Sequence, residues 1–231
     1  IETTRVLVTD AVRRQLVSDV PLCTFLSGGL DSSVVTAIAA KAYREKGNML
    51  ATYSFEYEGN HEDFHASLFQ PQSDDEFAAW LAERLGTDHT ILTASTEAVA
   101  DSLTPAVLAR DFPGQADIDS SLLWYCSQVK KRHTVALSGE CSDEIFGGYP
   151  WFYRPEMLSR DFYPWIHEPM ARIGLLRPEV ARADEGYAYL SEKYRNDLAA
   201  CPVADGESPE DRTARIATWL STRYFMTSLL E

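Results

Sequence analysis

The chain has 231 residues, of which 45% are apolar and 24% charged, with 12 glycines and 11 prolines. This profile excludes collagen, coiled coils and wholesale disorder, and the length suits one large domain or one domain with a helical extension. Lys and Arg total 21 against 35 Asp and Glu, giving a net charge of −14. Such a balance argues against a nucleic-acid partner, because nucleic-acid binding needs a clustered basic surface.

The sequence has no obvious membrane or secretion signal. Its longest uncharged run, residues 20–30, is too short to span a bilayer, and the first residues lack the basic and apolar regions of a signal peptide. The cysteines follow no CxxC or zinc-finger spacing: Cys23, Cys126, Cys141 and Cys201. We therefore expect a cytoplasmic protein with reduced thiols and no membrane partner. The chain begins without Met, which indicates a piece of a longer one.

The first part of the chain alternates helical and strand patterns. Residues 3–18 have helical apolar spacing, and the continuous apolar run 22–26 is typical of a strand buried on both faces. The Ala-rich stretch 31–46, closed by Gly47, predicts a helix. The alternation continues with strands at 50–57, 90–93 and 134–137 and with helices at 73–85, 96–110 and 119–131.

Strands that alternate with helices predict an α/β fold: a parallel sheet with helices on both faces and right-handed crossovers. After residue 150 the strand signal stops, and helices and turns rich in aromatic residues follow. We therefore predict an α/β domain over residues 1–150 and a mainly helical extension over 151–231. The helical pattern of 212–230 runs to the end of the chain without a cap, which indicates an incomplete C-terminus.

The loop after the first predicted strand suits phosphate binding. It reads Ser27-Gly28-Gly29-Leu30-Asp31-Ser32-Ser33 and leads into a helix. Glycines let the backbone approach an anion, and a helix N-terminus offers free N–H groups. The loop has no Lys and is not a Walker A loop, and its carboxylate, Asp31, would be favourable beside phosphates only with a divalent cation. The alternative is a tight turn capped by Ser and Asp.

The loop after the fourth predicted strand is acidic. In Ser138-Gly139-Glu140-Cys141-Ser142-Asp143-Glu144, three carboxylates lie within five positions. Ligands of parallel sheets bind beyond the carboxyl ends of the strands, so Asp143 could share Mg²⁺ with Asp31 if the two strands are neighbours. Glu140 would face the same cavity. The alternative is an acidic first turn that complements a helix dipole.

Together the two loops resemble a known family. SGGLDSS resembles the PP-loop of the ATP pyrophosphatases, which have an adenine nucleotide alpha hydrolase-like fold. SGECSDEIFGGYPWF resembles the matching loop of asparagine synthetases, which typically reads SGEGSDE-FGGY. The resemblance covers roughly residues 5–153 well. The paired motifs in this order are specific.

The resemblance implies a role for each matching residue. Those implied to hold the phosphates of ATP are Ser27, Gly28, Gly29, Ser32 and Ser33. Those implied to surround the adenosine are Leu26, Tyr57, Ser138 and Gly139. Asp31 and Asp143 would hold Mg²⁺, and Glu140 corresponds to an acidic residue at the acyl-acceptor site.

In that family, the β-carboxylate of aspartate attacks the α-phosphorus of ATP to give β-aspartyl-AMP and pyrophosphate. Ammonia then displaces AMP and leaves asparagine. The resemblance also implies a glutaminase domain in the full-length protein as the source of ammonia, and it suggests a homodimer. Basic residues for pyrophosphate would come from later segments, with Arg110, Arg132 and Arg154 as candidates within this chain.

The sequence departs from the family's pattern at Cys141, which stands where the family usually has Gly. Two alternatives to an asparagine synthetase stay open. One is a β-lactam synthetase-like or other amide-forming PP-loop enzyme with a different acceptor. The other is an ATP- or AMP-binding fragment without turnover. Glu140 and the segment GGYPWF favour the asparagine synthetase.

Overall fold

The computed structural model describes residues 1–60, 75–111, 114, 116–158, 162–175, 177, 179 and 182–227. The chain divides into two compact units, Ile1–Glu140 and Cys141–Glu231. The domain division expected from the sequence, 1–150 and 151–231, remains a prediction.

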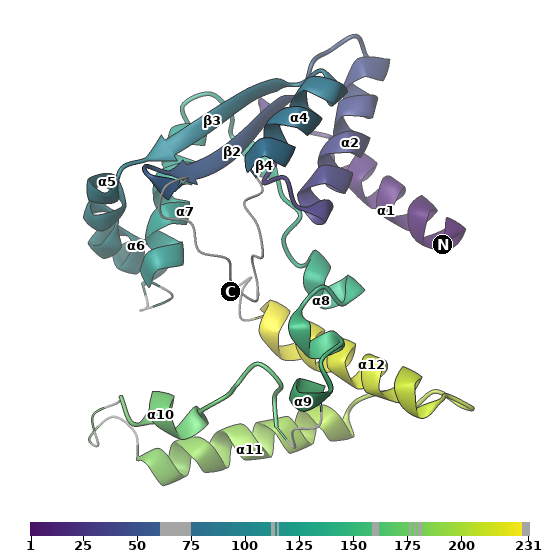
Figure 1. Cartoon of the computed structure of the whole chain (residues 1–231), viewed down its shortest axis with the longest axis vertical. Coiled ribbons are helices and arrows are strands. Elements are labelled where there is room, and N and C mark those ends of the chain that lie inside the picture. Colours follow the sequence, from purple (N-terminus) through teal and green to yellow (C-terminus); the bar gives the residue numbers. More distant parts are fainter. Residues whose placement is uncertain are drawn as a thin grey trace. The chain divides into compact units, whose positions relative to one another are not determined.

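A parallel sheet forms the centre of the first unit (Figure 1). Its strands are β1 (Leu22–Phe25), β2 (Ala51–Tyr57), β3 (Asp88–Ala94) and β4 (Val135–Leu137), in the order β3-β2-β1-β4. All three neighbouring pairs among these strands are parallel, which confirms the predicted α/β fold. Thr24 of β1 pairs with both Thr52 of β2 and Leu137 of β4, so the carboxyl ends of these strands finish at one edge.

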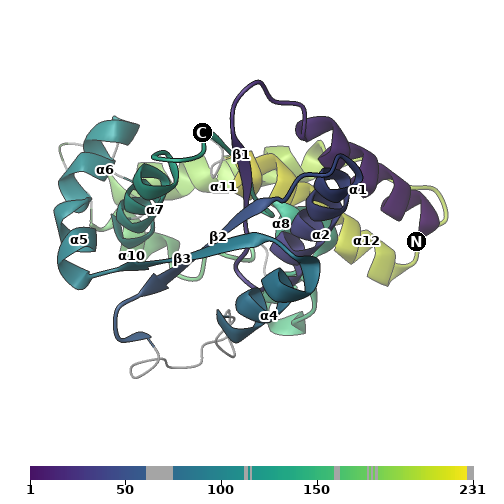
Figure 2. The same cartoon turned by 90° about the horizontal axis from the view of Figure 1, so that it is seen from above.

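Helices cover both faces of the sheet, as predicted. The helices described in this unit are α1 (Glu2–Gln15), α2 (Leu30–Glu45), α4 (Asp75–Leu85), α5 (Thr96–Asp101), α6 (Leu103–Arg110) and α7 (Ala116–Val129). α2 and α4 pack against each other and against β1 and β2, whereas α7 packs on the opposite face (Figures 1 and 2). The helix expected at 73–85 begins outside the described residues, and α4 is described from Asp75.

The single helix expected over 96–110 is two helices, α5 and α6. They meet at Ser102, whose backbone N–H donates to Val99 O (3.1 Å) and whose hydroxyl donates to Ala98 O (2.8 Å). Pro105 lies in the first turn of α6, where its missing N–H is tolerated, but it could not donate a hydrogen bond inside one continuous helix. The break therefore lies just before this proline.

One face of the sheet is aromatic. Tyr53 and Phe55 point to this face, where they pack with Cys23 and with Tyr125 of α7. The rings of Phe55 and Tyr125 lie 5.6 Å apart at 70°, an edge-to-face arrangement. Tyr53 and Phe55 are two positions apart in β2 and therefore lie on the same face of the sheet.

The opposite face carries buried hydroxyl groups. Thr24 and Thr36 are both fully buried, and their hydroxyls lie 2.9 Å apart. His89 of β3 lies between two hydroxyls of β2, with Nδ1 2.9 Å from Thr52 Oγ1 and Nε2 3.3 Å from Ser54 Oγ. Burial lowers the pKa of His89 from its ordinary value of 6.5, because the charged imidazole loses hydration.

The second unit is helical, as predicted for the C-terminal region. Its described elements are α8 (Ser142–Phe146), the 3₁₀-helix η1 (Pro150–Phe152), α9 (Pro155–Leu158), α10 (Pro169–Ile173), α11 (Ala183–Ala199), α12 (Pro209–Leu220) and the π-helix η2 (Ser221–Phe225). Ser208 caps α12 by accepting a hydrogen bond from Asp211 N, so this helix starts before the residue expected from the pattern.

Aromatic side chains form the core of the second unit. Tyr163 is fully buried and packs with Tyr194 and Leu220. Its hydroxyl donates to Asp197 Oδ2 at 2.6 Å, which satisfies the polar end of the ring. Across the described ranges, no helix has the length and apolar character needed to cross a bilayer.

The buried His89 predicts a loss of stability at acidic pH. Its pKa is lowered in the folded state, so the unfolded chain binds the proton more tightly and the free energy of unfolding falls as pH decreases through about 6.5. Replacing it by Gln, which keeps a donor and an acceptor but does not titrate here, should flatten this fall. Urea unfolding between pH 5 and 8 measures it.

The control for this experiment is His167→Gln, at an exposed histidine of the second unit. It should leave the pH dependence as in the wild type. An identical slope in His89→Gln and the wild type would contradict the assignment.

Candidate functional site

The first loop has the geometry of an anion-binding helix start. Gly28 has a φ of +94°, and Gly29 caps α2 in an extended conformation without a side-chain hydrogen bond to the first turn. The N-cap residue therefore supplies no side-chain cap to the first turn of α2, and the positive end of a 16-residue helix lies here. This arrangement suits the negative oxygens of a phosphate.

The serine hydroxyls hold the loop in shape. Ser33 Oγ and Ser32 Oγ donate to Gly29 O at 2.6 and 3.2 Å. Ser27 Oγ lies 2.9 Å from Ser32 Oγ, and the Ser27 N–H donates to that same oxygen at 3.2 Å. These hydrogen bonds within the loop fix its shape.

The second loop meets the first at Gly139. β1 and β4 are neighbours, so both loops leave the sheet at the same edge. A Cβ atom at Gly139 would lie 2.7 Å from Ser32 N and 2.8 Å from the carbonyl carbon of Asp31, which are both backbone atoms. Only glycine permits this approach. The adjacency of the two strands, on which the sequence argument depended, is confirmed.

The residues expected around the adenosine lie in different surroundings. Leu26 is fully buried against Ala78 and Ala82, so only its backbone could reach a nucleotide. Tyr57, at the carboxyl end of β2, is 44% exposed, and its hydroxyl lies 2.6 Å from Ser121 Oγ of α7. Ser138 is exposed, and its hydroxyl accepts the N–H of Glu140 at 3.2 Å. Their roles remain predictions.

Glu140 is exposed at the end of the first unit, and Cys141 begins the second. Cys141 has a φ of +71°, in the left-handed region that favours glycine. A glycine would adopt this conformation without strain, whereas the Cβ of Cys141 introduces strain here.

Asp143 lies in α8 of the second unit. Burial raises the pKa of its carboxyl above the ordinary 3.8, because the ionised form is partly desolvated. The backbone of Gly148 lies against it, so that a Cβ at Gly148 would clash with Asp143 Oδ1. Such a half-buried carboxylate gains from a bound cation.

Asp31 and Asp143 belong to different units, so their sharing of one metal ion remains a prediction. Among the described residues, no three His, Cys, Asp or Glu side chains gather as a metal site. The donor set nevertheless fits Mg²⁺, which binds through one or two carboxylates and completes its shell with water and substrate phosphates. Carboxylate oxygens are hard ligands of this kind.

Sequence reasoning missed a polar cluster beside this edge. Arg110 pairs with Asp119 (Nη1 to Oδ1, 2.9 Å), whose carboxylate lies against the backbone of Gly114. Ser120 and Ser121 follow in α7 and are buried. The signal was present as two serines directly after an aspartate at the start of a helix.

The basic residues expected for pyrophosphate are placed unfavourably. Arg132 precedes β4 and therefore lies at the amino end of that strand, opposite the loop edge, so this candidate is wrong. Arg110 is paired with Asp119, and Arg154 lies 3.6 Å from Glu156 in the second unit.

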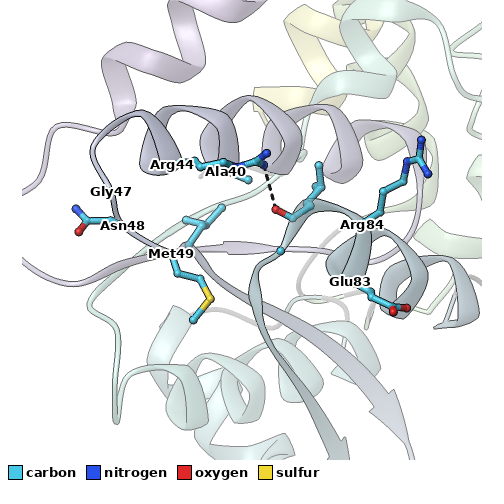
Figure 3. A pocket seen from close by; sticks show the side chains of 10 residues that line it. Ala40, Arg44, Gly47, Asn48, Met49, Glu83 and Arg84 are labelled. Carbon is cyan, nitrogen blue, oxygen red and sulfur yellow. Dashed lines mark hydrogen bonds between the residues drawn. The ribbon is translucent and has the colours of Figure 1, made fainter.

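A hollow of about 500 Å³ lies at the other end of the sheet (Figure 3). Its lining includes Arg44, Met49 and Arg84, from the C-terminal parts of α2 and α4 and the turns that precede β2 and β3. Arg44 donates to Leu85 O at 3.1 Å, the dashed line in Figure 3. This hollow is remote from the loop edge, so it is not part of the candidate site.

Comparison with known families gives one match over nearly the whole chain. The model of the family described as asparagine synthase matches residues 3–231. The chain is 47% identical to asparagine synthetase (glutamine-hydrolyzing) 3 of Bacillus subtilis over 232 residues, which covers 100% of the chain and 38% of that protein. The chain thus spans well under half of this relative.

Two further matches are a relative found by sequence and a solved structure. Amidase chyE of Penicillium rubens is 30% identical over 172 residues, covering 71% of the chain and 25% of that protein. A solved NAD⁺ synthetase from Burkholderia pseudomallei covers 96% of the chain and 86% of its own at 13% identity, with a TM-score of 0.32. A TM-score this low does not establish a shared fold, and the α/β fold is shown by the parallel strand order β3-β2-β1-β4.

The contact at Gly139 predicts that Ala substitutions at two glycines of the site will change the free energy of unfolding by different amounts. Gly139→Ala forces a Cβ against backbone atoms and should lower the free energy of unfolding by about 1–3 kcal/mol. Gly29→Ala is the matched control, because its Cβ would meet only Ser27 Oγ at 3.5 Å. Urea unfolding of both variants measures the effect, and equal stabilities would refute the close approach.

The left-handed backbone conformation of Cys141 predicts that a glycine at this position will make the protein more stable. Cys141→Gly removes the clash of a Cβ at positive φ, whereas Cys141→Ala keeps it. The glycine variant should therefore be more stable than the alanine variant by about 1 kcal/mol. Thermal and urea unfolding test this, and an alanine variant as stable as the glycine one would contradict it.

Proposed function

The chain belongs to the asparagine synthase family, and we propose that it is the synthetase part of a glutamine-dependent asparagine synthetase. It would use ATP to activate the β-carboxylate of aspartate as β-aspartyl-AMP, with release of pyrophosphate. Ammonia would then displace AMP to give asparagine. The observation that carries this proposal is the glycine-capped N-terminus of α2, which lies against the backbone of Gly139.

The first step joins two anions, so the site must reduce their repulsion. The residues proposed to hold the phosphates are Ser27, Gly28, Gly29, Ser32 and Ser33, at the positive end of α2. Asp31 and Asp143 are proposed to bind Mg²⁺, which when bound supplies positive charge to the phosphate oxygens. Leu26, Tyr57, Ser138 and Gly139 are proposed to surround the adenosine.

Glu140 is proposed to act on the incoming nitrogen. Its backbone N–H is held by Ser138 Oγ (3.2 Å), directly after the contact between Gly139 and α2, and its side chain is exposed. A carboxylate there can orient an amine and accept its proton as the C–N bond forms and the bond to AMP breaks. No covalent enzyme intermediate is needed, so Cys141 has no role as a nucleophile.

The ammonia source lies outside the chain in this proposal. The B. subtilis relative is named glutamine-hydrolyzing, and the chain spans 38% of it. We therefore propose a glutaminase domain elsewhere in the longer polypeptide. A homodimer remains a prediction from the resemblance, and a cytoplasmic location remains a prediction from the cysteine spacing and the sequence signals.

The identity of the carboxylate substrate that ATP activates has the least support from the site. Amidase chyE is similar over 71% of the chain, and its name is not that of an asparagine synthetase. The same adenylating site with another acceptor is therefore the second candidate.

The test is product analysis by phosphorus NMR with Mg-ATP, aspartate and ammonia, on the full-length protein and on this chain. We expect aspartate-dependent AMP and pyrophosphate. Glu140→Gln should lower asparagine formation by about 100-fold or more while ATP still binds. Glu83→Gln, in the remote hollow, is the control and should behave as the wild type.

Each other outcome has a definite meaning. Formation of ADP and phosphate would contradict the proposal. AMP formation that depends on another carboxylate would favour the second candidate. Turnover by the full-length protein alone would mean that segments outside this chain complete the site.

A further inference from the structure

Glu144, next to Asp143 in α8, is a fully buried carboxylate. Its Oε1 accepts the hydroxyl of Tyr149 at 3.0 Å, whereas its Oε2 has no hydrogen-bond partner within the described ranges. Burying a carboxylate with an unpaired oxygen is costly, so an apolar side chain would serve a purely structural purpose better. We propose that Glu144 and Tyr149 are positioning residues that orient the Asp143 carboxylate for Mg²⁺. This inference rests on the proposed function.

The orientation follows from helix geometry. Successive residues of an α-helix point about 100° apart, so the direction of one side chain determines that of the next. α8 has only five residues, and its N-cap residue makes no side-chain hydrogen bond to it. A buried anchor at Glu144 therefore sets the rotation of this single turn, and with it the direction of Asp143.

The anchor is itself held by the core of the second unit. The ring of Tyr149 stacks on Trp151, with centroids 4.2 Å apart at 26°, and meets Phe225 edge-on at 5.5 Å. Trp151 is 3% exposed and donates Nε1–H to the fully buried Ser221 Oγ at 3.1 Å. Displacing the Tyr149 hydroxyl would mean disturbing this packing.

The other side of Asp143 is limited by the glycine turn. The N–H groups of Gly147 and Gly148 donate to Asp143 O at 2.9 and 3.1 Å. The absent Cβ of Gly148 leaves the space that Asp143 Oδ1 occupies. Asp143 is therefore held between a backbone turn and a side-chain anchor, as a metal-binding carboxylate must be to keep its geometry.

The experiment uses Mn²⁺ as a probe for Mg²⁺, with bound Mn²⁺ measured by EPR in the presence of α,β-methylene-ATP. The full-length protein is used. Tyr149→Phe removes only the hydroxyl and should weaken Mn²⁺ binding by about tenfold. Glu144→Gln keeps an acceptor oxygen for the hydroxyl of Tyr149, so this variant should retain most of the wild-type affinity for Mn²⁺. Hydrogen exchange at the Gly147 and Gly148 amides should quicken in Tyr149→Phe.

Two matched variants separate orientation from stability. Tyr189→Phe changes an exposed tyrosine of α11 and should bind Mn²⁺ as the wild type does. Trp165→Phe disturbs the same aromatic core, with its ring 5.4 Å from Trp151, but leaves the hydroxyl of Tyr149 in place. Even if Trp165→Phe lowers the free energy of unfolding as much as Tyr149→Phe does, it should retain the wild-type affinity for Mn²⁺.

The inference is overturned if Tyr149→Phe binds Mn²⁺ like the wild type, or if Trp165→Phe loses as much affinity. A wild-type protein that binds no Mn²⁺ with the nucleotide would overturn the proposed function, and the inference with it. The two failures are therefore distinguishable.

Discussion

The candidate site depends on one backbone contact, the approach of Gly139 to the first turn of α2. Parallel pairing of β1 with β4 brings the two loops to the same edge, where a Cβ atom at Gly139 would lie only 2.7 Å from Ser32 N, so only glycine fits. Since both partners are backbone, neither loop can move without the other. The helix start and Glu140 are thus held in one rigid arrangement, which is the condition for reacting groups to meet in line.

Charge is the second constraint on this site. The chain carries −14 at neutral pH and places acidic side chains where an anionic ligand is proposed to bind. Within the described part of the first unit, helix N–H groups, the α2 dipole and a bound cation are proposed to neutralise the phosphate, because Arg132 lies at the opposite end of β4 and Arg110 is paired with Asp119. The serine hydroxyls add order rather than charge, since they bond mainly within the loop.

The aromatic core of the second unit fixes the orientation of α8, the helix that carries Asp143. Cys141, two residues before Asp143, has a left-handed backbone conformation. After Asp143 the chain enters a turn in which Gly147 and Gly148 donate hydrogen bonds to Asp143 O. A run of contacts links Glu144 through Tyr149 and Trp151 to Ser221, so a short helix near the surface takes its orientation from buried aromatic packing. A single turn of helix is unstable alone, and this packing explains how it stays formed.

Local pattern in the sequence was enough to identify the parallel sheet, most of its helices and the two loops, because apolar period, glycines and caps act over a few residues. It also identified the family, through the paired loop motifs. Tertiary structure decided what depends on distant partners: the break at Ser102, the buried Glu144, the ion pair of Arg110 with Asp119, and the place of Arg132 at the wrong edge. A side chain's partner and burial are set by residues far away in the chain, and no short-range pattern carries them.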